Sequence, residues 1–305
     1  MATQKQGFRF EAKIYKMVTK DKLVIRDLDY ANAVFQHISP FHLENFGLPW
    51  RKLDGTYREG TTFEMLVDAY LGDRMIKNFL FDYLADYEVQ LRHVVATVLN
   101  EAFGEYGYLD PGRFKNAEYH KNFINDLENE LTRANEPFVR HFQPKGDKMQ
   151  HVPVYVAVEV ITLGTLTKVV NNMRRPEQKK VAAFYGVRSE LVLNSYFKCF
   201  TTLRNTCAHH GRLSNRRFRD GCAILKEDQR TLEQLAPAYR PDPFRFFAML
   251  LGLMHVMGEK SSNEIIALFQ KTFAEHPHLA PRILDFPPHW ERALRMAAGL
   301  EALEK

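Results

Sequence analysis

The sequence predicts an all-α protein, because apolar residues recur at helical spacing along most of its length. The clearest pattern runs from Asp73 to about Phe103. A shorter helix is expected just before it, beginning near Thr61-Thr62, where Thr61 and Glu64 suit a capping box. The pattern is again helical from Asp228 onward, so no region of the chain calls for a sheet.

One stretch has the alternating pattern that is typical of a β-strand, with valines at every second position from Val152 to Val160. Its neighbours are all helical, and a lone strand without a pairing partner is not stable. We therefore expect a helix over residues 152–166. Glu159 is then a carboxylate in an apolar helix and needs a cation, for which Arg204, Arg212 and Lys168 are the candidates.

Composition places the protein in a general class without fixing its function. The formal net charge of +5 is compatible with an RNA partner but does not demand one. Since 45% of the residues are hydrophobic, the chain can bury a sizeable core. The three cysteines form no CxxC pair, which favours a reducing cytoplasm over a disulfide scaffold. No apolar run resembles a signal peptide or spans a membrane, so we expect a cytoplasmic protein without membrane contact.

The most informative stretch is residues 203–213, at the end of an apolar-periodic segment that Ser189 is expected to cap. The stripe of this helix contains Arg204 among otherwise apolar positions, and a partly buried guanidinium needs an anion. Gly211 follows as the expected C′ residue, since glycine adopts positive φ at little cost. The stripe consists of Leu193, Phe197, Phe200, Arg204 and Cys207.

Two interpretations of this stretch stay open on spacing alone. In the first, Arg204 pairs with an internal carboxylate, and His209 and His210 are surface residues at the helix end. In the second, the stretch cleaves a phosphodiester: a histidine transfers a proton and Arg204 stabilises developing charge. RNA supplies its own 2′-hydroxyl nucleophile, so no metal is required. Cys207 with the two histidines is not a complete zinc set, and we expect neither metal nor cofactor.

At these residues the sequence resembles two known groups. Arg204-Asn-x3-His209 resembles the R-x4-6-H signature of HEPN ribonucleases. The longer string Leu203-Arg-Asn-x-Cys-Ala-His-His-x-Arg-Leu-x-Asn-Arg216 is similar to that of the Abi family of bacterial abortive-infection proteins, in the AbiD/AbiF group. Residues 153–166 are similar to the same family's Pro-x-Trp-x-x-x-Glu-x-x-Ser-x-Gly-x-Leu segment, a buried helix, with Tyr155 and Thr162 replacing the Trp and Ser.

The resemblance implies a HEPN-like helical bundle over residues 61–228. A basic, partly helical region (1–60) precedes it and a helical extension (229–305) follows. It also implies that Glu88-x3-Arg92 faces the motif helix, with Glu88 as the anion for Arg204 and Arg92 as a phosphate contact. The chain departs from the family at residues 41–43, Phe-His-Leu, where an aromatic-Arg-Leu stretch is usual, so the role of that arginine cannot be transferred.

The implied function is a metal-independent endoribonuclease that acts in phage defence, with RNA as its partner. The alternative is a non-catalytic protein on the same scaffold that binds a structured non-coding RNA. On an ideal helix Arg204 and His209 lie about 140° apart, which is awkward for one compact site. We therefore expect a homodimer in which two motif helices meet. The implied catalytic residues are Arg204, Asn205 and His209, and the RNA-binding or supporting residues are His210, Arg212, Asn215, Arg216, Glu88 and Arg92.

Overall fold

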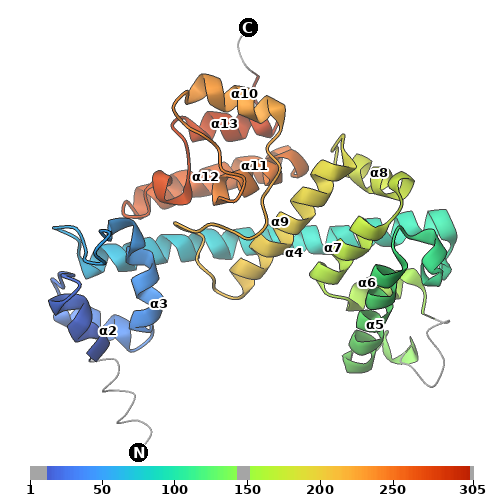
Figure 1. The fold of residues 1–305 in the computed structure, drawn as a ribbon, viewed down its shortest axis with the longest axis horizontal. Coiled ribbons are helices and arrows are strands. Elements are labelled where there is room, and N and C mark those ends of the chain that lie inside the picture. The colour runs from blue at the N-terminus through green and yellow to red at the C-terminus, as the bar shows by residue number, and fades with distance from the viewer. Residues whose placement is uncertain (1–11, 143–151, 303–305) are drawn as a thin grey trace, which may run out of the picture.

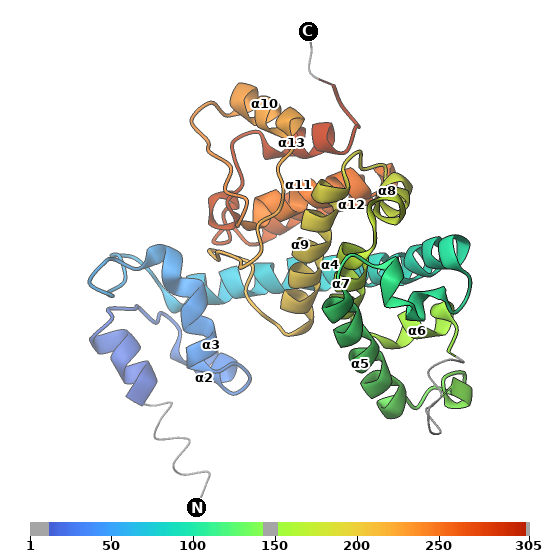
Figure 2. The same ribbon diagram turned by 45° about the vertical axis from the view of Figure 1, so that its right-hand side comes forward.

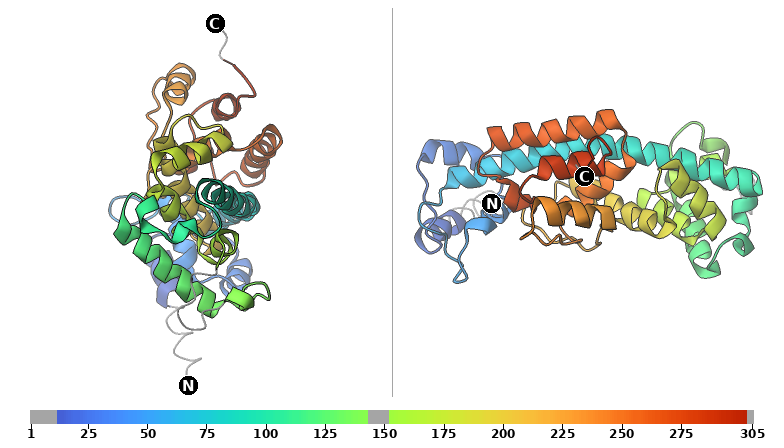
Figure 3. Two further views of the ribbon diagram at one scale, coloured as in Figure 1. Left: turned by 90° about the vertical axis from the view of Figure 1, so that its right-hand side faces the viewer. Right: turned by 90° about the horizontal axis from the view of Figure 1, so that it is seen from above.

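One long helix organises the protein. The computed structural model describes residues 12–142 and 152–302, and helix α4 (Phe63–Phe103) runs along most of its length. Its 41 residues extend for about 60 Å. The N-terminal helices lie at one end of α4, helices α5 and α6 at the other, and the C-terminal helices along its middle (Figure 1; Figure 3, right).

The all-α prediction is confirmed, since the described residues form helices and only isolated β-bridges. Among the helices that are described, none combines the length and the apolarity needed to cross a lipid bilayer. The α-helices besides α4 are α2 (Leu28–Phe35), α3 (Pro40–Glu44), α5 (Ala117–Arg133), α6 (Val154–Val160), α7 (Leu163–Asn172), α8 (Arg175–Phe184), α9 (Glu190–Ala208), α10 (Lys226–Leu235), α11 (Phe246–Val256), α12 (Glu259–Glu275) and α13 (Trp290–Ala297). The 3-10 helices are η1 (Asn45–Trp50), η2 (Gly107–Leu109), η3 (Pro111–Arg113), η4 (Arg140–Phe142) and η6 (Pro281–Leu284).

The start of α4 differs from the prediction in two ways. The two helices expected on either side of Gly72 are one continuous helix. Gly72 lies where the C-terminal region crosses α4: a Cβ there would come within 2.9 Å of the His276 side chain. The N-cap is Thr62, whose hydroxyl accepts the backbone N–H of Met65, and not Thr61. Glu64 instead accepts backbone N–H groups from residues 26 and 27, which joins α4 to the N-terminal region.

The N-terminal region has a small core of its own on the first turns of α4. Arg51 holds its loops together by pairing with Glu44 and with Asp21, 3.3 Å away. Residues 1–11, which include the basic residues Lys5 and Arg9, lie outside the described residues. The buried apolar residues of this core are Met17, Leu23, Ala31, Leu43, Tyr57, Phe63, Leu66 and Val67.

The main core is continuous from Ile76 to Leu294. It joins α4 to α5–α9 and equally to α10–α13, so residues before and after position 228 contribute to the same core. Helix α9 packs against α4, α7, α8 and α11, which places it at the centre of the molecule (Figure 2). Its C-terminal end therefore rests on a rigid support.

Residues 152–166 are helical as predicted, but a break at Ile161-Thr162 divides them into α6 and the start of α7. The cause is Arg92 of α4. Its guanidinium donates hydrogen bonds to the carbonyl groups of Val158, Glu159 and Ile161 at the end of α6. The predicted pairing of Glu159 with a cation is wrong: its side chain is exposed and forms no ion pair with any described residue.

Candidate nucleic-acid site at the end of helix α9

Helix α9 begins and packs as its sequence predicts. The Ser189 hydroxyl accepts the Val192 N–H at 3.5 Å, and the apolar positions of the stripe are buried. The helix ends in a Schellman motif, in which the N–H of Gly211 bonds to the Thr206 carbonyl at 2.8 Å and that of His210 to Cys207 at 3.2 Å.

The residue with positive φ in this motif is His210, at 55°, so the prediction that Gly211 occupies the C′ position is wrong. Gly211 is required for space, because a Cβ there would come within 3.0 Å of Thr206 and of the Arg216 guanidinium. A histidine in the left-handed region is strained by about 1 kcal/mol. Such strain is often found at functional sites, and here it lies in the middle of the motif.

Arg204 pairs with the carboxylate that the family resemblance implied. Its Nε lies 3.0 Å from Glu88 Oε2, and its guanidinium lies 5.9 Å from the centre of the Phe81 ring. The pair is electrostatic, because the Nε–H is not aligned for a hydrogen bond to the carboxylate. A long contact of 3.4 Å to Asn205 Oδ1 engages one other donor. The side chain is 30% exposed, so part of the guanidinium is open to a ligand although its Nε is buried.

The carboxylate of Glu88 serves two guanidiniums. Arg92 Nη2 lies 2.6 Å from Oε1, while Arg204 approaches Oε2. One negative charge therefore faces two permanent positive charges, and Arg204 is the least buried side chain of the three. The local excess of positive charge favours an anion at this point.

Arg92 itself does not present a surface for phosphate. It is buried, and the carbonyl groups at the end of α6 together with Glu88 engage its guanidinium. Its described role is to hold α6 against α4. We therefore correct the expectation that it contacts phosphate.

Asn205 and His209 are exposed and lie four residues apart on α9, on a different side of the helix from the apolar stripe. Neither the His209 nor the His210 ring forms a hydrogen bond or ion pair with a described residue. Both imidazoles are thus free to meet a ligand. Arg204 faces α4 instead, and no contact joins it to His209 among the described residues of this subunit.

Residues 212–216 form a tight loop, which its two arginines stabilise by donating hydrogen bonds to backbone carbonyl groups. Arg212 is half-buried and donates to the carbonyl groups of Asn45 and Asn215. Burial lowers the pKa of Arg212, and the nearby charge of Arg216 adds to the effect while Asp73 opposes it. Asn215 has a φ of 45°, and its N–H bonds to the Ile283 carbonyl at 2.7 Å.

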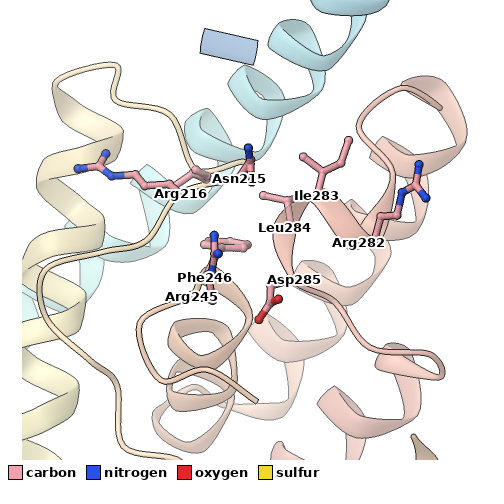
Figure 4. A pocket seen from close by; sticks show the side chains of 9 residues that line it. Asn215, Arg216, Arg245, Phe246, Arg282, Ile283, Leu284 and Asp285 are labelled. Atoms are coloured by element: carbon pink, nitrogen blue, oxygen red, sulfur yellow. The ribbon is translucent and has the colours of Figure 1, made fainter. Parts of the chain in front are cut away.

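Arg216 turns back over the motif. Its Nη1 donates to the Arg212 carbonyl at 3.3 Å, and its guanidinium lies 5.0 Å from the centre of the Phe218 ring. Figure 4 shows the side chain directed away from the small pocket that contains Arg245 and Asp285. Arg216 nevertheless lines that pocket, so it connects the pocket to the α9 end.

Two buried residues that the sequence analysis missed anchor the loop. Asp73 of α4 accepts the backbone N–H groups of Leu213 at 3.0 Å and Ser214 at 2.8 Å. Its second oxygen lies 3.1 Å from the amine of Lys77, one turn further along α4. Both side chains are buried. A charged i,i+4 pair inside an apolar helical pattern was the available signal.

His42 of α3 was set aside in the sequence analysis, yet it lies beside the motif. Its ring packs against Phe46 and Tyr70, with both ring centroids 5.7 Å away. Burial lowers the pKa of His42, and the charges of Lys77 and His210 lower it further while Asp73 opposes them. A third imidazole therefore belongs to the surroundings of the α9 end.

Cys207 lies within the motif, and its side chain is buried. Burial raises the pKa of its thiol to about 12, so it stays protonated near neutral pH. Across the part of the chain that the structure describes, no three His, Cys, Asp or Glu side chains are grouped to hold a metal ion.

Comparison with known protein families matches residues 33–215 to Abi-like protein. The chain belongs to the Abi-like family. The match begins within α2 and ends at Asn215, so it includes α4, α9 and every candidate site residue except Arg216, but not α10–α13. Membership implies a role in abortive infection, a form of phage defence. No curated protein matches the chain, and no solved structure does.

Proposed function

We propose that this Abi-like protein is an RNA-binding endoribonuclease of the HEPN type that acts in phage defence without a metal ion. The observation that carries the proposal is the state of Arg204. Its guanidinium is held over α4 by a carboxylate that it shares with Arg92, and it keeps open donors. Exposed imidazoles follow within the same motif.

The chemistry requires one proton acceptor and one proton donor. The 2′-oxygen of RNA attacks the adjacent phosphorus and loses its proton to one imidazole, while a second imidazole protonates the departing 5′-oxygen. The products are a 2′,3′-cyclic phosphate and a 5′-hydroxyl. Arg204 stabilises the negative charge that develops on the phosphorane oxygens, and Asn205 orients the phosphate.

A symmetric dimer forms two equivalent sites, each of which combines Arg204 of one copy with His209 and the adjacent His210 of the other. Within one subunit no contact between described residues joins Arg204 to His209, and an ideal helix places them about 140° apart, which supports a site assembled from both copies. The buried Asp73–Lys77 pair fixes the loop after α9 and so gives the two motifs a defined geometry. The partners in this proposal are RNA and a second copy of the chain.

His209→Ala tests the proposal directly. We expect cleavage of single-stranded RNA in the presence of EDTA to fall by about 10²- to 10⁴-fold, the usual contribution of a general acid–base histidine. The free energy of unfolding should not change, because the ring is exposed and unpartnered. His37→Ala, at another exposed histidine, is the matched control and should cut like the wild type. Undiminished cleavage by His209→Ala refutes the assignment.

A second candidate function also has support from the structure. Since Arg204 and His209 do not meet within one subunit, the same surface can hold a structured non-coding RNA without cutting it. Both functions predict binding that weakens steeply with salt. The ends of the products separate them, because only the enzyme generates 2′,3′-cyclic phosphate ends.

A further inference from the structure

A second pocket lies between helices α5, α7 and α9, and none of the motif residues lines it. Its volume is about 670 Å³, within the range of about 300–1,000 Å³ that is usual for small-molecule sites. Helix α7 packs against both α5 and α9, and Figures 1 and 2 show the three helices on the same part of the molecule.

Three cations from different segments border this pocket: Lys168 of α7, Lys198 of α9, and Arg219 beyond α9. All three are exposed, and none forms an ion pair with any described residue. The only carboxylate in the lining is Asp126, which already accepts the Thr165 hydroxyl at 3.0 Å. Uncompensated charges that converge on one cavity favour an anionic ligand.

The floor of the pocket is aromatic and rigid. Phe114 and Phe123 are buried, and the His120 ring lies between them and donates to the Tyr108 carbonyl at 2.8 Å. Tyr119 is 64% exposed, and its hydroxyl has no hydrogen-bond partner among the described residues. An exposed ring beside free cations is the combination that binds a base and its phosphate.

We propose that this pocket binds one nucleotide. The phosphate lies among Lys168, Lys198 and Arg219, and the base stacks on Tyr119. The carboxamides of Asn122 and Asn171 in the lining supply donors and acceptors for the base edge. A nucleotide is favoured over an acidic peptide because an aromatic ring and two amides suit a flat, polar base.

The pocket also has a defined relation to the motif helix. Lys198 and Asn205 are seven residues apart and so lie on the same side of α9, about 10 Å from one another along its axis. An RNA strand with one nucleotide in the pocket can therefore continue toward the end of α9. This extension rests on the proposed function, whereas nucleotide binding by the pocket does not.

The test measures binding of two probes, 5′-AMP and a fluorescent ten-nucleotide single-stranded RNA, to the full chain by calorimetry and fluorescence anisotropy. The variant is Lys198→Ala with Arg219→Ala. Because the variant removes two of the three charged donors to the phosphate, we expect its affinity to fall at least about tenfold. Lys179→Ala with Arg230→Ala, an exposed and unpaired Lys/Arg pair on α8 and α10, is the matched control and should bind like the wild type.

Tyr119 gives a second, independent measurement. Tyr119→Phe keeps the ring and should keep affinity, whereas Tyr119→Ala should weaken binding, and the residue is too exposed for either change to unfold the protein. Binding of both probes assigns the pocket to nucleotides in general, and binding of RNA alone assigns it to a nucleotide within a strand.

Three results overturn the assignment: failure of both probes to bind the wild type, unchanged affinity in the Lys198/Arg219 variant, or equal competition by polyglutamate. Repeating the titrations with His209→Ala separates the two proposals. If His209→Ala still binds nucleotide and still cleaves RNA, the ribonuclease assignment is refuted and nucleotide binding by the pocket stands.

Discussion

The buried pair of Asp73 and Lys77 gives the sharpest prediction about how the motif is positioned. Asp73 is fully buried, accepts two backbone N–H groups from the loop and lies 3.1 Å from the Lys77 amine. Asp73→Ala leaves the Lys77 charge and both N–H groups without partners. Removing one partner of a buried pair typically costs about 3–5 kcal/mol, and we expect a loss of this size in the free energy of unfolding.

Urea denaturation measures the loss, and hydrogen exchange shows where it acts. Protection of the Leu213 and Ser214 amides should fall selectively, because their acceptor is gone. Asp82→Ala, at an exposed position of the same helix, is the control and should change stability by less than about 0.5 kcal/mol. Combining Asp73→Ala with Lys77→Met should recover part of the loss, since no buried charge is then unpaired.

A cost below about 1 kcal/mol for Asp73→Ala contradicts this account of the loop. So does unchanged protection of the Leu213 and Ser214 amides. Either result means that Arg212 and Arg216 hold the loop in place without the buried pair on α4.

Three further predictions concern single residues. His210→Gly should raise the free energy of unfolding by up to about 1 kcal/mol in urea titrations, because relief of the left-handed strain of about 1–2 kcal/mol exceeds the entropic cost of glycine; a clear decrease contradicts the Schellman geometry. Cys207 should resist iodoacetamide at pH 8 in the folded protein, since burial raises the pKa of its thiol to about 12; modification without unfolding contradicts its burial. Burial raises the pKa of Asp68, but hydrogen bonds from His276 and His278 outweigh this and hold it below 3.8. The stability that Asp68 contributes is therefore present above about pH 4 and is lost as the pH falls through the lowered pKa. The difference in free energy of unfolding between the wild type and Asp68→Asn, measured by urea titration, should therefore shrink in acid. A difference that does not change with pH contradicts this linkage.

The features that local sequence fixes were predictable, and α9 shows this most clearly. Its cap, its apolar stripe and the need of Arg204 for an anion all follow from residues within one helix. Glu88 as the partner came from the family resemblance, because no spacing rule links residues 116 positions apart. The continuity of α4 through residue 72 was not predicted, because a glycine in a helical pattern resembles a helix end. The reason for Gly72 is the close approach of His276, a contact between residues far apart in the sequence.

The errors around the motif have the same origin. The i,i+4 spacing of Glu88 and Arg92 indicates a pair on the helix surface. The structure shows that Arg92 also donates to three carbonyl groups at the end of α6, which lie between 66 and 69 residues away in the sequence. The backbone groups that Asp73 holds are 140 and 141 residues away. Only the packed fold shows which charged residues are anchors and which, like His209, remain open to a ligand.

The measurement that tests the central claim most directly is complementation between two inactive variants. Arg204→Ala and His209→Ala are each expected to be inactive, but a site built from two copies can combine the intact Arg204 of one with the intact His209 of the other. Equimolar mixing and subunit exchange should then restore roughly a quarter of the wild-type rate, because half of the dimers are mixed and each mixed dimer has one complete site. Activity that stays at the level of the separate variants, in dimers shown to have exchanged, contradicts a shared site.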